Sequence, residues 1–272
     1  MMREFVTFTI QTRRKQVESG VLAANRDFQG AADGDVYILY TGASLADKDL
    51  RWLQGKDVIA ANLAFLHERY RDIEIKHYSL VESWSYRNFT FLGFLLDLAL
   101  SRRKRGTRPT VWLSTAARHY IDTPSLHNDF NTGDLLSGVD LQFVRSNGDF
   151  VGEKVVRSDF AEVCNVAQGT MTFCIFLAIY LGYKRIYLLG SDYSKRPMLL
   201  GHFYDGVSEE ASVDGMNEIA GFDICAQVDV RARSMNDYAK SKGVEIINVV
   251  DEGYVSRVFA AVSYKSLVQG GG

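Results

Sequence analysis

Short apolar runs alternate with helix-length segments along the chain, and each run ends in turn-forming residues. The runs have the length and the β-branched and aromatic content of buried strands. They cover residues 35–40, 57–61, 74–78, 109–113, 185–189 and 244–248. Helices are expected over 170–181 and 228–242, because each segment has the length of a helix and stops at a glycine. This alternation predicts an α/β fold with a doubly wound, mostly parallel sheet, whose ligand site lies on the loops after the strands.

The domain organisation that this pattern suggests is simple. The 272 residues contain three prolines, no repeat of fixed period and no linker-like segment, and this length is near the upper end for one domain. We therefore expect a single α/β domain over 1–268, with its core at about 35–250. Residues 269–272, Gln-Gly-Gly-Gly, are interpreted as a flexible tail.

Composition narrows the class of protein. The net charge of −2 means that the protein as a whole has no positive charge to attract nucleic acid, so a nucleic-acid partner is not expected. Cys164, Cys174 and Cys225 form no CxxC pair and are interpreted as small core residues in a reducing compartment. The first charged residues are followed by no long apolar run, and the apolar stretches 89–100 and 171–181 are too short to cross a bilayer. A cytoplasmic protein without a transmembrane segment is the expectation.

The turn after the first predicted strand is a candidate phosphate site. It reads Thr41-Gly42-Ala43-Ser44, and Ser44 and Asp47 have the spacing of a capping box that would begin a helix. Backbone N–H groups at a helix N-terminus attract phosphate. The turn lacks the lysine of a P-loop and the three glycines of a dinucleotide fingerprint, so a plain glycine turn between strand and helix is an equal alternative.

Two further polar positions precede or follow predicted elements. Asn62 ends the second strand, where its amide could contact a base or sugar edge or could simply form a turn. Gly169-Thr170 opens the most apolar helix, where the threonine hydroxyl could cap the helix while facing a ligand. Capping alone would also explain the threonine.

The clearest candidates for chemistry come after the strand 185–189. Asp192 follows Gly190-Ser191 directly, at a position where open α/β sheets carry functional groups. His202 lies ten residues later in Gly-His-Phe-Tyr-Asp and could act as a general base. A loop histidine without a function is the alternative. The other histidines show no metal-ligand spacing and are interpreted as structural or surface residues: His67, His77, His119 and His127.

A dense basic run, Arg102–Arg108, is expected on a loop. Most such runs are solvated, and peripheral contact with an anionic membrane surface or an anionic acceptor is the alternative.

These motifs, taken in order, resemble a known family. The sequence Tyr-Thr-Gly-Ala-Ser-Leu at 40–45, then Asn62, then Gly169-Thr170, then the segment 178–192 and finally Gly201-His202 are similar to the bacterial sialyltransferases of glycosyltransferase family 42. They are equally similar to a wider group of bacterial surface-polysaccharide proteins built on the same Rossmann-like domain, a group that also resembles the archaeal enzyme that pyrophosphorylates hydroxymethylpterin. The resemblance spans residues 36–248 and implies a single-domain variant like the GT-A glycosyltransferases.

The resemblance also implies roles for individual residues. Nucleotide and donor sugar would be bound by the first turn, by the asparagine and by the helix start, and His202 would be the catalytic base beside Asp192. Tyr193 or Tyr204 would grip the leaving phosphate. The binding residues are then Thr41, Gly42, Ala43, Ser44, Asn62, Gly169 and Thr170. Two positions depart from the family: it has asparagine in place of Thr41, and Ser194 and Lys195 stand where its tyrosines would be.

The function implied is a metal-independent glycosyltransferase that needs no cofactor. It would transfer a sugar, with a CMP-linked nonulosonic acid as the favoured donor, to a cell-surface glycan. One alternative is a Mg²⁺-dependent pyrophosphokinase in which Asp192 and Asp205 hold the metal. Another is a non-catalytic subunit that binds a nucleotide sugar or a glycan. The sequence leaves the donor, the acceptor, the linkage and the oligomeric state open.

Overall fold

A computed structural model describes residues 19–81, 108–115, 117, 139–148, 150, 155–166, 169–191, 221–250 and 258–270. Within these ranges nine strands form one sheet in the order β6-β5-β4-β3-β2-β1-β7-β8-β9, and every neighbouring pair is parallel. The strands are β1 (Asp35–Leu39), β2 (Val58–Ala61), β3 (His77–Leu80), β4 (Thr110–Ser114), β5 (Asp140–Ser146), β6 (Val163–Cys164), β7 (Arg185–Leu189), β8 (Glu245–Val250) and β9 (Ala260–Ser263). The predicted doubly wound parallel sheet is confirmed.

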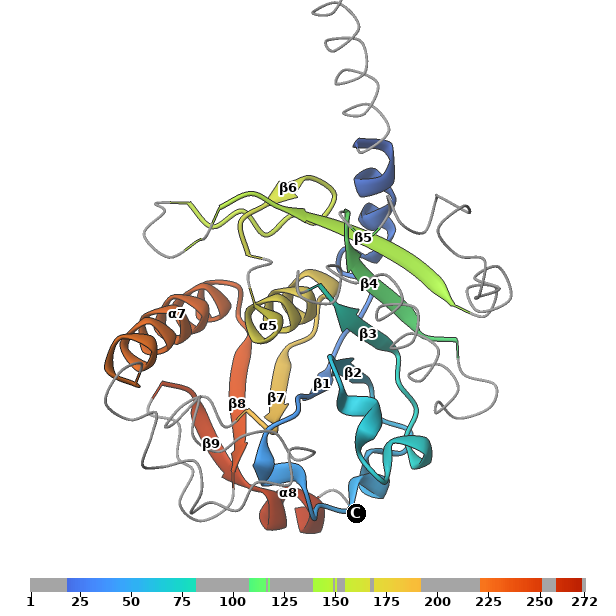
Figure 1. Ribbon diagram of the computed structural model, residues 1–272, viewed down its shortest axis with the longest axis vertical. Helices are drawn as coiled ribbons and strands as arrows, with labels where there is room; N and C mark the ends of the chain where they lie inside the picture. Colours follow the sequence, from blue (N-terminus) through green and yellow to red (C-terminus); the bar gives the residue numbers. More distant parts are fainter. Residues whose placement is uncertain are drawn as a thin grey trace, which may run out of the picture.

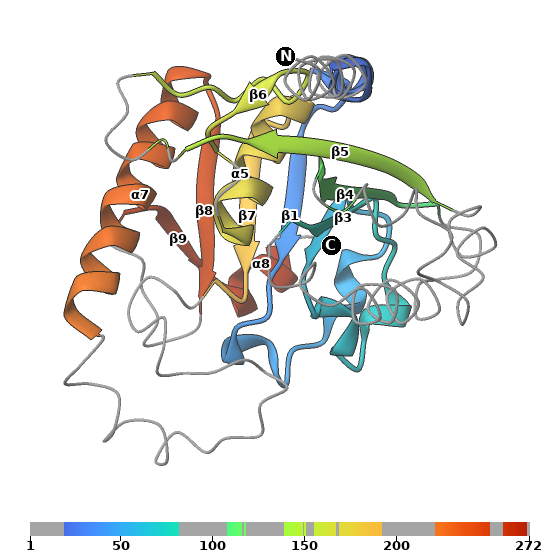
Figure 2. The same ribbon diagram turned by 45° about the horizontal axis from the view of Figure 1, so that its top comes forward.

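Two layers cover the sheet (Figures 1 and 2). The helices α5 (Thr170–Leu181) and α7 (Gly221–Ser241) pack side by side on one face. The other face carries α8 (Tyr264–Gly270) and short 3₁₀ turns. The 3₁₀ turns on this face are η2 (Ala43–Leu45), η3 (Leu50–Leu53), η4 (Ala64–Leu66) and η5 (Tyr70–Asp72), whereas η1 (Ala24–Phe28) packs against the core cluster around α5. Gln269 and Gly270, assigned to a tail from the sequence, are the last two residues of α8.

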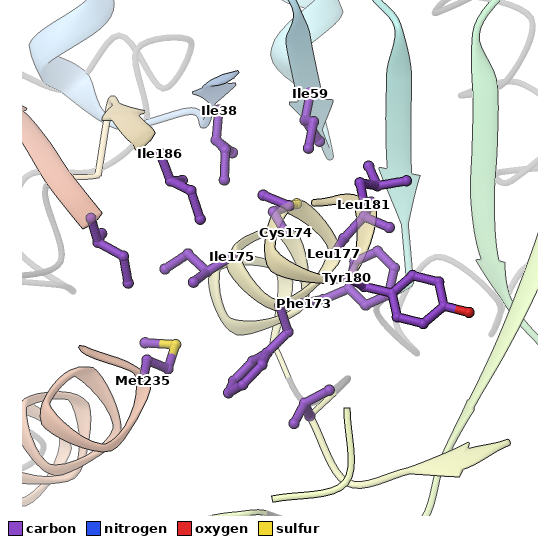
Figure 3. Close-up of a cluster of buried hydrophobic side chains, with 14 of the residues drawn as sticks. Ile38, Ile59, Phe173, Cys174, Ile175, Leu177, Tyr180, Leu181, Ile186 and Met235 are labelled. Atoms are coloured by element: carbon purple, nitrogen blue, oxygen red, sulfur yellow. The ribbon is translucent and has the colours of Figure 1, made fainter. Parts of the chain in front are cut away.

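Helix α5 lies at the centre of the larger core cluster (Figure 3). Its apolar residues surround the whole helix, so it is buried on one side by β1, β2 and β3 and on the other by α7. Ile175 and Leu177 are fully buried, and Met235 of α7 packs into the same cluster. α5 runs antiparallel to β7, the strand that follows it, so its first turn lies at the carboxyl edge of the sheet.

The end of α5 is closed by backbone from another part of the chain. Gly182 adopts a left-handed conformation with φ 108° and stops the helix. The last carbonyls of an α-helix have no partner within the helix, and here those of Tyr180 and Leu181 accept hydrogen bonds from the N–H groups of Gly30 and Ala32, at 2.9 and 2.7 Å. The segment before β1 thereby anchors α5.

The described elements that follow β1 and β7 lie on opposite faces of the sheet. After β1 the chain enters η2, whose Leu45 belongs to the core cluster on the α8 side. The next described element after β7 is α7, which packs with α5 on the other side. In open parallel sheets, a crevice for ligands forms where adjacent strands part in this way. That point lies at the carboxyl ends of β1 and β7.

Candidate functional site

The loops after β1 and β7 touch through their backbones. Gly42 donates its N–H to the carbonyl of Gly190 at 3.0 Å, directly beyond the last sheet bond, in which Tyr40 donates to Leu189 at 2.9 Å. Gly190 has φ +67°, and a Cβ there would lie 2.6 Å from Leu45 Cδ1 and 3.2 Å from the Gly42 nitrogen. Only glycine satisfies both constraints, so Gly190 is what allows the two loops to approach.

The turn after β1 differs from its prediction. No α-helix begins there: η2 is a single 3₁₀ turn whose N-cap is Gly42, without a side-chain cap bond, and Ser44 lies inside the turn. The expected capping box is therefore wrong. The reason is the spacing of the buried leucines, since Leu45 and Leu50 would lie about 140° apart on an α-helix and could not face one core. The candidate phosphate loop is thus a tight turn in which Thr41 is buried and Gly42, Ala43 and Ser44 are half-buried.

Asn62 ends the neighbouring strand β2, and its backbone and side chain make three hydrogen bonds. It has φ 49°, the one non-glycine residue of the described chain in the left-handed region, which asparagine tolerates better than most residues. Its N–H donates to Ser79 at 3.1 Å, and its carbonyl accepts from the hydroxyl of Tyr78. Its side-chain Oδ1 accepts a hydrogen bond from the hydroxyl of Thr170 at 3.2 Å. Asn62 is thus both a turn former and a side chain turned toward α5.

The N-terminus of α5 therefore differs from a side-chain-capped helix end. Gly169 occupies the N-cap position with φ 78° and has no side chain with which to cap, and Thr170 is the first helical residue. The N-cap position expected for Thr170 is held by Gly169, and the threonine hydroxyl donates to Asn62. The first N–H groups of a helix have no partner within it and carry partial positive charge. This end of α5 thus carries partial positive charge next to Asn62.

Two contacts tie the first turn of α5 to the ends of β1 and β7. The hydroxyl of Tyr40 donates to the carbonyl of Met171 at 3.1 Å, and the hydroxyl of Ser191 donates to the Met171 sulfur at 3.5 Å. Burial, and secondarily Cys174, raises the pKa of Tyr40 well above its ordinary value, so its hydroxyl stays protonated and remains a donor. The predicted residues after β1 and β2 and at the start of α5 are therefore gathered at one place.

Several predicted residues lie outside the described ranges. These are the catalytic candidates Asp192 and His202, the phosphate candidates Tyr193 and Tyr204, and positions 102–107 of the basic run. Arg108, the last residue of that run, forms an ion pair with Asp140 at 2.9 Å. His119 and His127 also lie outside the described residues.

Sequence reasoning gave no role to Tyr40, Gly190 or Ser191, although all three belong to motifs that it singled out. Their strand-end position was the available signal for Tyr40 and Ser191. For Gly190 the signal was a glycine directly after a buried strand, which often marks close backbone approach.

The second aspartate of each Asp-x-Asp sequence in the chain is paired with an arginine. Two Asp-x-Asp sequences occur, at 33–35 and 47–49. Asp35 binds Arg185 at 2.6 Å, and Asp49 binds Arg51 at 2.6 Å. Across the described residues no cluster of three or more His, Cys, Asp or Glu side chains is arranged to hold a metal ion.

A cavity of about 540 Å³ lies at the far end of α5, away from these loops. Its walls include the end of α5, the end of α7 and the segment around Ser158, and none of the predicted site residues lines it. Of the helices that the structure describes, none has both the length and the apolar character needed to cross a membrane.

Comparisons with known proteins bear on the fold. No family model matches the chain, and no curated protein matches it. Among solved structures, it is similar to the MAf glycosyltransferase from Magnetospirillum magneticum AMB-1, with a TM-score of 0.51 and 17% identity over 88% of this chain. The match spans 35% of that protein, so this chain corresponds to about a third of its length. The chain thus has an α/β, Rossmann-like fold that recurs in a glycosyltransferase.

Proposed function

We propose that this protein is a metal-independent glycosyltransferase that binds a nucleotide sugar at the β1–β7 switch point. The observation that carries the proposal is the convergence of three polar segments there: the turn after β1, Asn62 after β2 and the start of α5. The Thr170–Asn62 hydrogen bond joins the second to the third, and the hydrogen bond from Tyr40 to the Met171 carbonyl joins the end of β1 to α5. The fold shared with a glycosyltransferase is consistent with this function, and the site residues are those implied by the sialyltransferase resemblance.

The geometry suggests how the donor would bind. We expect the turn 41–44 and the first turn of α5 to present partial positive charge to a phosphate, although the N–H of Gly42 itself is engaged by Gly190. Asn62 retains both N–H donors of its amide for the nucleotide or sugar, since Thr170 engages its oxygen. A CMP-linked nonulosonic acid is the donor that the family resemblance favours, and a cell-surface glycan is the proposed acceptor.

The proposed reaction needs one base. His202 accepts the proton of the acceptor hydroxyl while that oxygen attacks the anomeric carbon of the donor sugar. The bond from the anomeric carbon to the phosphate oxygen breaks, and its electron pair leaves with CMP. Donors at the two backbone sites stabilise the phosphate as its charge develops. Asp192 is proposed to orient the base.

Binding is the first test. CMP and a panel of other nucleotides are added to the purified protein, and the shift in melting temperature is recorded. A ligand at a hundred times its dissociation constant stabilises the folded state by about 2.7 kcal/mol, which is readily measured. Absence of a shift with every nucleotide and nucleotide sugar would contradict the proposal.

Catalysis is the second test, measured as release of CMP from the donor with and without a glycan acceptor. His202→Ala should lower turnover by roughly 10²–10⁴-fold with donor affinity retained, and His127→Ala is a control histidine outside the motif. Activity should persist in EDTA. Loss of activity in EDTA together with ATP-dependent pyrophosphoryl transfer would instead support the kinase, and binding without turnover would support a non-catalytic subunit.

A further inference from the structure

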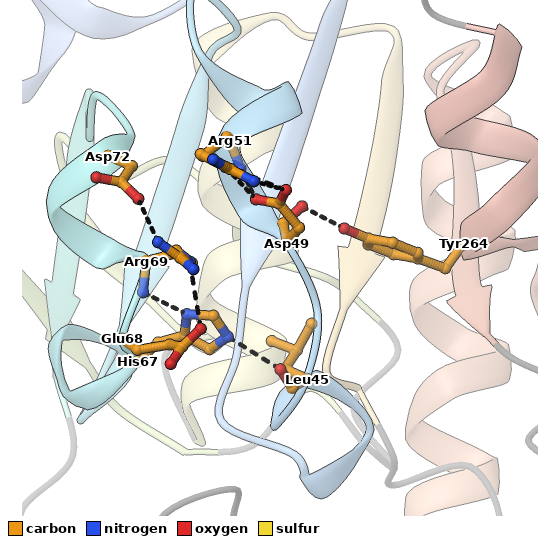
Figure 4. A network of polar contacts seen from close by, with 8 residues as sticks. All are labelled: Leu45, Asp49, Arg51, His67, Glu68, Arg69, Asp72 and Tyr264. Carbon is orange, nitrogen blue, oxygen red and sulfur yellow. Dashed lines mark hydrogen bonds and ion pairs between the residues drawn. The ribbon is translucent and has the colours of Figure 1, made fainter.

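His67 is a buried histidine that belongs to none of the predicted site segments. It follows η4, the 3₁₀ turn after β2, and is 4% exposed. Its Nδ1 accepts the backbone N–H of Arg69 at 3.1 Å, and its Nε2 lies 2.9 Å from the carbonyl oxygen of Leu45 (Figure 4). Because an amide N–H can only donate, Nδ1 is the acceptor and Nε2 carries the proton. The imidazole therefore donates to Leu45, 22 residues earlier in the chain.

Leu45 connects the loops of the candidate site. Its N–H donates to Gly42 at 3.1 Å, which closes the turn after β1. Its side chain fills the space beside Gly190 that a Cβ at that position would need. Since Gly42 also donates to Gly190, Leu45 packs against both partners of that contact. A group that holds Leu45 in place thus holds the turn after β1 against the loop after β7.

The polar contacts around His67 are mostly exposed. Arg69 reaches Glu68 and Asp72 with N–O distances of 3.2 and 3.6 Å, and Asp49 binds Arg51 (Figure 4). Solvent-exposed ion pairs contribute little to stability. The His67–Leu45 hydrogen bond is buried at both ends and is the one of these contacts that links the segment after β2 to the turn after β1.

We propose that His67 is a positioning residue for the turn 41–44. Its hydrogen bond to Leu45 holds the turn against the loop after β7, in the position from which the proposed function has the turn bind the donor phosphate. The inference rests on the proposed function, since it assigns His67 to the same site. His67 touches no substrate itself; it acts through Leu45.

Two substitutions separate the hydrogen bonds of His67. Glutamine places an amide nitrogen near the position of Nε2 and can still donate to Leu45. Asparagine places an oxygen near the position of Nδ1 and can still accept from Arg69 but cannot reach Leu45. His67→Gln should bind CMP within about threefold of wild type, and His67→Asn should bind at least about tenfold more weakly, at a temperature where both are folded. Equal losses in the two variants, or no loss in either, would overturn the proposal.

A ligand-free readout distinguishes this proposal from the proposed function. The N–H of Lys48 donates to the same Leu45 carbonyl at 3.0 Å, so its hydrogen exchange reports on the end of the turn. Exchange should accelerate in His67→Asn and remain near the wild-type rate in His67→Gln. If wild-type protein bound no nucleotide, the proposed function would fail, while this contrast would still show whether His67 holds the turn. Identical exchange in both variants would overturn the positioning role regardless of binding.

Discussion

The hydroxyl of Thr170 donates to the side-chain oxygen of Asn62 at 3.2 Å, across 108 residues of sequence. Each residue had a local explanation, a helix cap for the threonine and a turn for the asparagine. Gly169, not the threonine, holds the N-cap position, and the contact shows that the asparagine side chain is directed at the start of α5. Two positions selected independently from the sequence are therefore direct neighbours at the carboxyl edge of the sheet.

Asn62→Gly should weaken donor binding by about 1–3 kcal/mol, because it removes an amide that the proposed site uses. Glycine retains the left-handed backbone at φ 49°, whereas Asn62→Ala would add a strain of about 1 kcal/mol. Calorimetric titration with CMP measures the first effect, and urea unfolding measures the second. Wild-type affinity in Asn62→Gly would return Asn62 to a purely structural role.

The two glycines that join the loops should respond differently to substitution. Gly190→Ala should lower the free energy of unfolding by about 2–4 kcal/mol, since φ is +67° and the new Cβ would press on Leu45 in the core. Gly42 has φ −65°, which any residue adopts. Gly42→Val should therefore leave the sheet folded and remove nucleotide binding by blocking close approach of the phosphate. Unaltered binding of every nucleotide in a folded Gly42→Val protein would exclude the turn as the phosphate site.

The sequence predicted the central strands because each is a continuous apolar run bounded by turn residues. β7 begins and ends as predicted, and β1, β2, β4 and β8 agree within two residues. β3 begins three residues later than predicted, because Ile73 and Ile75 are buried in the connection before it and extend the apolar run. Strands nearer the sheet edges were missed: β5 mixes polar and half-buried residues, β6 has two residues, and β9 is largely exposed.

The candidate site was predictable in position but not in its contacts. Strand ends in a parallel sheet meet at one edge, so the grouping of the turn 41–44 with Asn62 follows from topology. The bond from His67 to Leu45 and the fit of Leu45 beside Gly190 depend on how segments far apart in sequence pack. No local pattern encodes such contacts, and the same holds for the choice of 3₁₀ turns over a helix after β1.

Gly182 should be among the least replaceable glycines of the described chain. A Cβ there would lie 2.5 Å from the Ala32 carbonyl oxygen and 3.0 Å from the Gly30 Cα, and both contacts are backbone. Gly182→Ala should lower the free energy of unfolding by about 3 kcal/mol or more, because α5 or its anchoring segment must move. Gly243→Ala is the matched control: it follows α7 at φ +70° with nothing within 4 Å and should cost only about 1 kcal/mol. Equal losses in urea unfolding would contradict the anchoring of α5.

The last prediction concerns the dependence of stability on pH. His77 is buried in β3, where its Nδ1 accepts the indole N–H of Trp112 at 3.3 Å. Burial, and secondarily the charge of Lys76, lowers its pKa from 6.5 to about 4. Between these values the unfolded chain takes up a proton that the folded protein does not. The free energy of unfolding should therefore be highest above pH 6.5 and fall toward pH 4, with His77 accounting for about 3 kcal/mol of the loss.

His77→Asn isolates this contribution. Asparagine keeps an acceptor for Trp112 but does not titrate, so the variant should lose less stability than wild type between pH 6.5 and 4 when urea unfolding is followed across that range. Carboxylates with lowered pKa values change the free energy of unfolding only at lower pH. In Asp57, burial raises the pKa, but hydrogen bonds from Lys76 and Tyr183, both at 2.6 Å, outweigh it, and the pKa is lowered overall. Its contribution is present above the ordinary value of 3.8 and is lost only as the pH falls below it. Parallel pH profiles for wild type and His77→Asn between pH 6.5 and 4 would mean that His77 becomes protonated in the folded protein as readily as in the unfolded chain.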